Sequence, residues 1–268
     1  MFSRFLSLAA FSLMLSSCGT HAASPQLREL RICADPNNLP FTNERLEGFE
    51  NKIADLIAKD LKATPRYTWW AQRRGFFRNT LDARLCDIVM GVPVGLEMTL
   101  PTRPYYRSTY VFLYRRDRAL TIHSFDDTSL RRLTIGVQIV GDDAANTPPA
   151  HALSKRGMTR NVRGYTLYGN YSDRSPPARI VDAVTKGDVD VAVVWGPLAG
   201  YFSKLQRVPM TIIPVSPGND GPALPFVFDI AVGVRKGEAA FRDEIQRVLD
   251  LRKTEIQKIL DDYGIPRV

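Results

Sequence analysis

The hydrophobic positions between residues 30 and 93 alternate between the periods of strands and of helices. Continuous apolar runs at 30–33 and 86–92 predict strands buried on both faces, and the aromatic run at 66–70 predicts another strand. Between them, apolar residues recur at helical spacing: Phe49, Ile53, Leu56, Ile57 and Leu61 before Pro65, and then Phe77, Leu81 and Leu85. This order predicts the start of an open parallel sheet with crossover helices.

A second copy of this pattern begins near residue 132. An apolar strand at 132–137 precedes a Gly-Asp-Asp elbow, and 178–197 repeats the unit of a helix followed by a buried strand. The two buried strands also share their borders, which are Cys86-Asp87, Gly91 and Pro93 in the first copy and Val189-Asp190, Gly196 and Pro197 in the second. The closing segment 228–264 adds a strand and one or two helices, which are expected to return to the first lobe.

These patterns predict an α/β fold of two lobes with a cleft between them. Each lobe is expected to be an open, mainly parallel sheet flanked by helices. Lobe 1 is expected to comprise residues 24–117 together with 222–268, and lobe 2 to comprise residues 118–221.

Residues 1–23 are expected to be a signal peptide and a tether rather than part of the fold. Arg4 precedes an apolar core at 5–15, which is too short to span a bilayer. The sequence Leu-Ser-Ser-Cys ending at Cys18 resembles the lipobox of bacterial lipoproteins, in which this cysteine carries lipid. The alternative is ordinary signal-peptidase cleavage near residues 20–23. Both readings predict export to the periplasm, and the lipid on Cys18 would be the protein's one contact with a membrane.

Export changes the expected chemistry of the cysteines. Cys33 and Cys86 remain in an oxidising compartment, and their strands are neighbours in a 2-1-3 sheet order, so we expect them to form a disulfide. Two free thiols are one alternative. A metal site is another, but the chain has no CxxC pair, and His123 and His151 are remote from both cysteines in sequence. No metal site and no cofactor are expected.

Candidate binding residues follow from the expected cleft. Ligands of open α/β sheets bind at the carboxyl ends of the strands, where the elbow after residue 33 would present Asp35, Asn37 and Asn38. Pro36 and Pro40 would stiffen its backbone. The alternative is a plain turn between a strand and a helix, to which these residue types are also well suited.

The second lobe and the connection between the lobes add further candidates. Trp195 is expected at the cleft edge with Tyr105 and Tyr106 opposite, which favours an uncharged or planar small molecule. The two tyrosines could equally pack in a hinge or core. Asp142 is placed with the cleft residues, although with Asp143 it could instead begin a helix and stabilise its dipole.

The charge of the chain points to an acidic partner. The formal net charge is +8 with a pI of about 9.5, and Arg73, Arg74 and Arg78 cluster where a strand is expected to meet a helix. Cations oppose the dipole at a helix N-terminus, so we expect the cluster to bind a partner; a solvated loop is the alternative. Export and the lack of a recognisable motif disfavour nucleic acid. The chain has no GxSxG, HExxH, Walker A or GxGxxG sequence, and we do not expect an enzyme.

Long segments of the chain resemble a known family. ADPNNLPFTNERLEGFENKIADLIA, YTWWAQRRGFFRNTLDARLCDIVMGVP and TRPYYRSTYVF are similar to substrate-binding proteins associated with quinoprotein dehydrogenases, the MxaJ and XoxJ proteins of methanol oxidation, which have the type II periplasmic binding protein fold. The resemblance implies a periplasmic accessory protein that binds a PQQ-dependent methanol or alcohol dehydrogenase, alone or together with its cytochrome c, and aids its activation, maturation or assembly. The alternative is the substrate-binding protein of an ABC transporter for a small uncharged or planar solute, a cofactor or a metal complex.

The amino-acid binders of the same fold carry anchors that this sequence lacks. They place Thr-x-x-Arg after the third strand, where the guanidinium holds the ligand carboxylate. Here Gly95, Leu96 and Glu97 stand in that region, and Arg103 is too close to the following Pro-Tyr-Tyr element. Trp195 and its neighbours stand where an acidic residue would meet the ammonium group. We therefore expect that α-amino acids do not bind.

Overall fold

The structure is a computed structural model that describes residues 28–140, 146–166 and 171–268. The expected signal peptide with Cys18, and the candidate Asp142, lie outside the described residues. No helix of the described part is long and apolar enough to cross a membrane.

The first half of the sheet is built around β1 (Arg28–Ala34). β1 lies between β4 (Ala63–Trp69) and β5 (Ile88–Pro93) and runs parallel to both, which is the expected 2-1-3 order. β12 (Val227–Val234) pairs with β5 in the antiparallel direction, and the short β6 (Leu100–Pro101) pairs with β12. The closing segment therefore returns to the first half of the sheet, as the sequence predicts.

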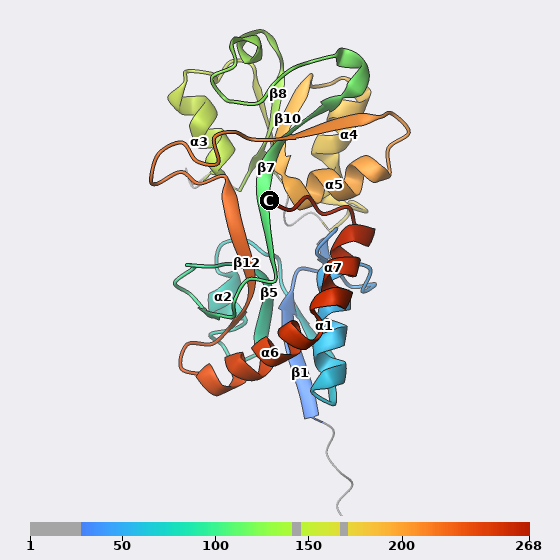
Figure 1. The fold of residues 1–268 in the computed structure, drawn as a ribbon, viewed down its shortest axis with the longest axis vertical. Coiled ribbons are helices and arrows are strands. Elements are labelled where there is room, and N and C mark those ends of the chain that lie inside the picture. Colours follow the sequence, from blue (N-terminus) through green and yellow to red (C-terminus); the bar gives the residue numbers. More distant parts are fainter. Residues whose placement is uncertain (1–27, 141–145, 167–170) are drawn as a thin grey trace, which may run out of the picture.

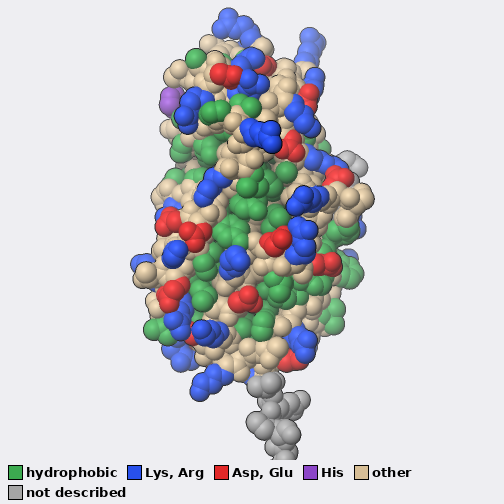
Figure 2. All heavy atoms as spheres, turned by 90° about the vertical axis from the view of Figure 1, so that its right-hand side faces the viewer, with side chains coloured by type: hydrophobic (Ala, Val, Ile, Leu, Met, Phe, Trp, Pro, Cys, Tyr) green, Lys and Arg blue, Asp and Glu red, His purple; other side chains and the backbone are tan. Residues whose placement is uncertain are grey.

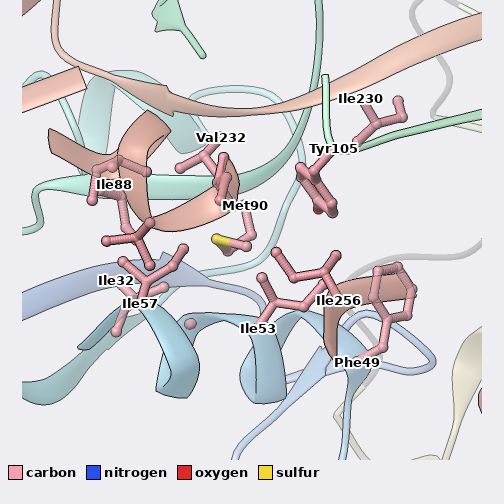
Figure 3. Close-up of a cluster of buried hydrophobic side chains, with 14 of the residues drawn as sticks. Ile32, Phe49, Ile53, Ile57, Ile88, Met90, Tyr105, Ile230, Val232 and Ile256 are labelled. Carbon is pink, nitrogen blue, oxygen red and sulfur yellow. The ribbon is translucent and has the colours of Figure 1, made fainter. Parts of the chain in front are cut away.

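One face of this half-sheet is covered by three helices. They are α1 (Phe49–Asp60), α6 (Ala239–Leu251) and α7 (Lys253–Asp262), which lie side by side in the lower part of Figure 1. The core between them and the sheet is apolar, and Figure 3 shows Ile53 of α1 and Ile256 of α7 turned toward Met90 of β5. The spacing that predicts α1 therefore also identifies its buried face.

The helix expected over Phe77, Leu81 and Leu85 is wrong. α2 (Phe76–Asn79) has a single turn, and Leu85 is half exposed while Leu81 is buried. Gly75 before it has φ = +88° and Arg84 after it has φ = +59°, so left-handed residues bracket the segment. The helix ends at Thr80, whose φ of −127° and ψ of −80° are not helical, so only one turn forms although the apolar spacing would allow more.

The second half of the sheet repeats the first. β8 (Ile135–Ile139) lies between β9 (Val162–Thr166) and β10 (Val191–Trp195) and is parallel to both. β7 (Tyr106–Arg115) pairs antiparallel with β10, and β11 (Met210–Pro214) pairs with the other edge of β7. The flanking helices are α3 (Pro148–Lys155), α4 (Arg179–Lys186) and α5 (Gly196–Lys204).

Two long strands join the halves. Tyr106–Thr109 of β7 pair with Val227–Ile230 of β12, whereas β7 pairs with β10 from Tyr110 onward. The strand pairing therefore changes over inside β7 rather than after residue 117, and the two half-sheets form one ten-stranded order. In Figure 1 these two strands run between the upper and lower parts of the molecule.

Short elements complete the described fold. They are the strands β2 (Asn37–Asn38) and β3 (Thr42–Asn43) and the 3-10 helices η1 (Arg116–Arg118), η2 (Thr128–Arg132) and η3 (Pro176–Ala178). The carboxyl-terminal residues form a further link between the halves, because the Ser108 Oγ donates to the Pro266 carbonyl at 2.6 Å and the Lys204 Nζ donates to the Asp262 carbonyl at 2.8 Å.

Candidate binding cleft between the lobes

A cleft of about 280 Å³ lies where the two half-sheets meet. Its walls come from the elbow after β1, the start of α1, the bulged part of β5, the two connecting strands and the carboxyl ends of β8 and β10. The cleft is therefore at the carboxyl ends of parallel strands, where ligands of open α/β sheets bind.

Three aromatic rings from three different strands form one wall of the cleft. Tyr110 of β7, Trp195 of β10 and Phe228 of β12 contact one another edge to face. The ring centroids are 5.3 Å apart for Tyr110 and Trp195, 5.8 Å for Trp195 and Phe228, and 6.4 Å for Tyr110 and Phe228. Each ring is fixed by the other two, so the wall is rigid, and aromatic faces of this kind bind apolar, planar or cationic groups.

Amide side chains line the cleft opposite and beside this wall. The Asn38 Nδ2 donates to the Gln72 Oε1 at 3.1 Å, which holds both side chains at the cleft. The Gln138 Oε1 accepts the backbone N–H of Trp195 at 3.2 Å, and the Thr147 hydroxyl donates to the Gln138 carbonyl at 2.7 Å. These bonds keep the polar lining in place without adding charge.

Among the described residues of the lining, Glu50 is the one with an ionisable acidic side chain. It lies in the first turn of α1 and is only 5% exposed, and burial raises its pKa to about 8. No hydrogen bond or ion pair reaches its carboxyl group from the described residues. Gly91, at φ = +69° in the bulge of β5, leaves room for this carboxyl group, because a side chain there would collide with it.

Glu50 is not among the cleft residues predicted from the sequence, although the sequence carries a signal for it. Residues 50, 53, 54 and 57 follow helical spacing, so Glu50 belongs to the stripe of α1 that the apolar residues Ile53 and Ile57 identify as buried. An acidic residue in a buried stripe is uncommon and is the pattern to look for.

The structure divides the expected cleft residues into two groups. Asn38, Tyr106 and Trp195 line the cleft, whereas Asp35, Asn37 and Tyr105 do not. Tyr105 lies in the core of the first half, where Figure 3 shows it beside Met90 and Ile256.

Asp35 is buried and stabilises the elbow through hydrogen bonds to the backbone. It is 2% exposed, and its carboxylate accepts the backbone N–H groups of Asn37 at 2.8 Å and Gln72 at 2.7 Å. Burial raises the pKa of Asp35, and the two N–H groups act against this rise. Asp35 therefore shapes the loops that present Asn38 and Gln72 instead of facing the cleft itself.

The elbow after β1 (residues 35–41) also contacts the second lobe. The Asn37 Nδ2 donates to the Asp173 carbonyl at 2.6 Å, and Leu39 is buried in the apolar cluster that Val111 and Val194 belong to. The elbow after β1 is therefore a contact between the lobes as well as part of the cleft.

Cys33 and Cys86 form the expected disulfide, with their Cα atoms 5.5 Å apart. Cys33 lies in β1, and Cys86 lies two residues before β5, the strand that neighbours β1. The bond ties the strand that leads into the elbow to the neighbouring strand of the sheet.

Arg73, Arg74 and Arg78 are exposed around the short helix α2. They share a shallow depression with Phe77 and with Met98, which is 49% exposed. By contrast, the face formed by α1, α5 and α7 carries basic and acidic side chains intermixed (Figure 2). The role of the cluster in binding a partner stays a prediction.

The anchors of an amino-acid ligand are absent from the described lining. Arg103 is on the surface, where its guanidinium bonds Asp250 at 2.5 Å and its backbone N–H bonds Gln246. No Arg or Lys stands among the described residues that line the cleft. A carboxylate ligand would therefore meet Glu50 and no cation. Within the described ranges, no group of three or more His, Cys, Asp or Glu side chains could hold a metal ion.

Comparisons with known proteins agree with this architecture. No protein-family model matches the chain. MoxJ from Methylorubrum extorquens is 31% identical over 263 residues, which is 94% of this chain and 85% of MoxJ. The crystal structure of the periplasmic binding protein XoxJ from Methylobacterium extorquens AM1 has a TM-score of 0.72 at 33% identity, and covers 89% of this chain and 99% of XoxJ.

More distant structures share the fold. The crystal structure of MxaJ from Methlophaga aminisulfidivorans MPT has a TM-score of 0.77 at 25% identity, and covers 89% of this chain and all of MxaJ. The substrate-binding protein of an amino acid ABC transporter has a TM-score of 0.59 at 22% identity, which shows a common fold alone. The type II periplasmic binding protein fold predicted from the sequence is confirmed. The chain belongs to the family of the MoxJ and XoxJ proteins.

Proposed function

We propose that this protein is a periplasmic accessory protein of methanol oxidation, which binds a PQQ-dependent methanol or alcohol dehydrogenase and aids its activation, maturation or assembly. The observation that carries the proposal is a binding-protein cleft that has lost the charged anchors of its amino-acid-binding relatives, in a chain of the MoxJ and XoxJ family. Such a cleft keeps the fold's capacity to bind but not its usual ligand. The proposal includes export to the periplasm, with a lipid anchor on Cys18 if cleavage precedes it.

A basic and apolar surface supports the binding of a protein partner. On the first lobe, the side chains of Arg73, Arg74 and Arg78 line one depression with Phe77 and Met98, and Asp82 is the acidic residue among the described residues of this lining. Arg, Met and aromatic residues are the types enriched at protein interfaces, and the excess positive charge of the chain suits an acidic partner. We infer that this surface, which we call the arginine face, docks the dehydrogenase, and that the cleft receives a ligand or a side chain of the partner.

The arginine face is tested by the charge reversal R73E/R74E. Charges at the edge of an interface act mainly on the rate of encounter and are screened beyond about 8 Å at physiological salt. We expect the variant to associate with the purified dehydrogenase at least tenfold more slowly at low salt, with a smaller difference at high salt. Surface plasmon resonance at several salt concentrations measures both rates.

A matched control is available on the other lobe. Arg131 and Arg132 are also adjacent and exposed, at the end of η2, so R131E/R132E changes the net charge by the same amount. The arginine face is rejected if the two variants slow association equally, or if the rate for the native protein does not depend on salt.

The cleft itself supports a second candidate function, the delivery of a small solute to a transporter. Its volume and aromatic wall suit a small uncharged or planar molecule. A transport receptor is stabilised by its solute alone, by about 2.7 kcal/mol at a hundredfold excess over Kd, whereas an accessory protein responds to its partner. A thermal-shift screen of alcohols, cofactors and α-amino acids separates these functions.

A further inference from the structure

The lining of the cleft combines one buried acid with a rigid aromatic wall and no basic side chain among the described residues. Glu50 reaches the cleft from the first turn of α1, and Tyr110, Trp195 and Phe228 face the cleft from the three strands that meet there. Tyr106 lines the same cleft, and its pKa is affected by both Glu50 and Trp195. The negative charge and the π faces therefore belong to one site.

An unpaired carboxyl group in such a position calls for a ligand. Burying an acid without a partner is unfavourable, and proteins normally pair such groups or expose them. The space for this carboxyl group is made by Gly91, whose left-handed backbone and missing side chain are both needed there. The carboxyl group of Glu50 is therefore accommodated at the lining of the cleft, where a ligand can reach it.

We propose that the cleft binds the ammonium end of an alkyl amine, with Glu50 as the anionic partner and the rings of Tyr110, Trp195 and Phe228 as the aromatic wall. A cation is attracted both to a carboxylate and to the faces of aromatic rings, and both attractions strengthen when water is excluded. An anion would be repelled by Glu50 and would find no cation in the described lining. The inference rests on the proposed function, because it names what the cleft would receive.

The size of the cleft fits a short amine. Five non-hydrogen atoms need about 150 Å³ if each takes the share of a water molecule in the liquid. The cleft of about 280 Å³ therefore admits a four-carbon ammonium ion. This is also the structure of a lysine side chain, so the amine could be a free small molecule or a lysine of the partner, which share one recognition chemistry.

The burial of Glu50 makes binding depend on pH. Its pKa of about 8 means that the carboxyl group is largely protonated at pH 7, and a cation must displace that proton. Burial alone raises the pKa of Glu50, and the titratable groups whose own pKa the Glu50 charge raises are the phenols of Tyr67 on β4, of Tyr105 just before β7 and of Tyr106 at its start. Burial raises the pKa of all three, so they stay neutral below pH 9, and no charged side chain of the other elements around α1 contributes to the shift of Glu50.

Calorimetry with n-butylammonium and with 1-butanol tests the proposal. The two probes have the same number of non-hydrogen atoms and differ in charge, and the ammonium group, like that of lysine, stays charged up to pH 9. We expect the affinity for butylammonium to rise about tenfold from pH 6 to 7 and only about twofold from pH 8 to 9. The affinity for 1-butanol should not rise, because it gains nothing when Glu50 ionises. Equal pH profiles for the two probes would overturn the proposal.

Three variants identify the residues responsible. E50Q keeps the shape but removes the charge, and should weaken butylammonium at least tenfold at pH 8 while leaving 1-butanol within twofold. W195L keeps an apolar side chain but removes a π face, and should weaken butylammonium more than 1-butanol. D55N, on the exposed side of the same helix, should change neither. The proposal is overturned if E50Q and D55N bind butylammonium equally well.

Association with the dehydrogenase separates the two sources of the amine. If E50Q weakens association and butylammonium competes with it, the amine is a lysine of the partner. If E50Q binds butylammonium poorly but associates normally, the amine is a free molecule. Failure of the proposed function gives a different result from failure of the amine site. If the proposed function is wrong, the native protein does not associate with the dehydrogenase, even though it still binds butylammonium through Glu50.

Discussion

The two lobes share one plan but differ at a few positions. In lobe 1, Asp87 precedes β5, and its carboxylate accepts the backbone N–H of Arg31 at 3.1 Å. In lobe 2, Asp190 precedes β10, and its carboxylate accepts the N–H of Thr134 at 2.9 Å. Each aspartate also donates its own N–H back to the carbonyl of the same residue. The strand orders β4-β1-β5-β12 and β9-β8-β10-β7 are equivalent, so these bonds are part of a repeated scaffold.

The differences between the lobes lie beside this shared scaffold. The positions of Cys33 and Cys86 correspond to Gly136 and Val189 in lobe 2, where a side chain on the glycine would touch the valine at 3.3 Å. At this position the neighbouring strands are joined by a disulfide bond in lobe 1 and only by side-chain packing in lobe 2. Lobe 1 also carries the elbow that contacts lobe 2 through Asn37 and Leu39. The disulfide therefore fixes β1, the strand that leads into this elbow.

The largest expected effect comes from removing the disulfide. In the chain-entropy model, a bond across a sequence separation of 53 residues stabilises the fold by about 4 kcal/mol. C33A/C86A should therefore lower the free energy of unfolding by about that amount, as measured by urea denaturation. The lobe 2 variant V189A removes two buried methyl groups and should cost about 2 kcal/mol. Equal costs for the two variants would contradict the distinction between a covalent and a packed contact.

The sequence predicts the repeated scaffold better than the contacts between its copies. The apolar runs, the terminators and the two cysteines lie within each repeat, where short-range patterns determine the strands, and the 2-1-3 order then makes β1 and β5 neighbours. Tertiary contacts set the rest. Leu39 enters the core of the other lobe, Asp35 turns away from the cleft, and Glu50 is buried by residues distant in sequence. The spacing of apolar residues along the chain does not predict these contacts between distant segments.

A smaller effect is expected from the two aspartates, and it should be unequal. Asp87 is partly buried and also bonds the guanidinium groups of Arg31 and Arg235, whereas Asp190 bonds the more exposed Arg118. D87N should cost about 2 kcal/mol, below the range for fully buried pairs, and D190N should cost about 1 kcal/mol. Urea denaturation at pH 7 measures both. The comparison fails if D190N costs as much as D87N.

The contribution of Asp87 should also depend on pH. Burial acts to raise its pKa, but the bonds from Arg31 and Arg235 outweigh burial, and the pKa in the folded protein lies below the usual value of 3.8. A carboxyl group with a lowered folded pKa stabilises the fold above its unfolded pKa and loses that contribution as the pH falls through the folded value. The difference in stability between the native protein and D87N should therefore be constant above about pH 5 and shrink below pH 4. A difference that grows toward low pH would contradict this sign.

An effect as small as that of D190N is expected from a pair of equivalent hydroxyl groups, one in each lobe. The Thr42 hydroxyl donates to the Asp35 carbonyl, and the Thr147 hydroxyl donates to the Gln138 carbonyl, both at 2.7 Å and both buried. Valine has nearly the shape of threonine but cannot donate, so T42V and T147V should each cost about 1 kcal/mol, the net value of one hydrogen bond.

Because the two threonines lie in different lobes and share no partner, T42V/T147V should cost the sum of the single variants within about 0.5 kcal/mol. Thermal denaturation of the four proteins measures this cycle. Unequal single costs would mean that the two elbows are not equivalent in spite of their matching bonds. A double variant that costs clearly more or less than the sum would show that the two elbows are energetically coupled. The cleft is the expected route of such coupling, because Asn38 of the first elbow and Gln138, the partner of Thr147, both line it.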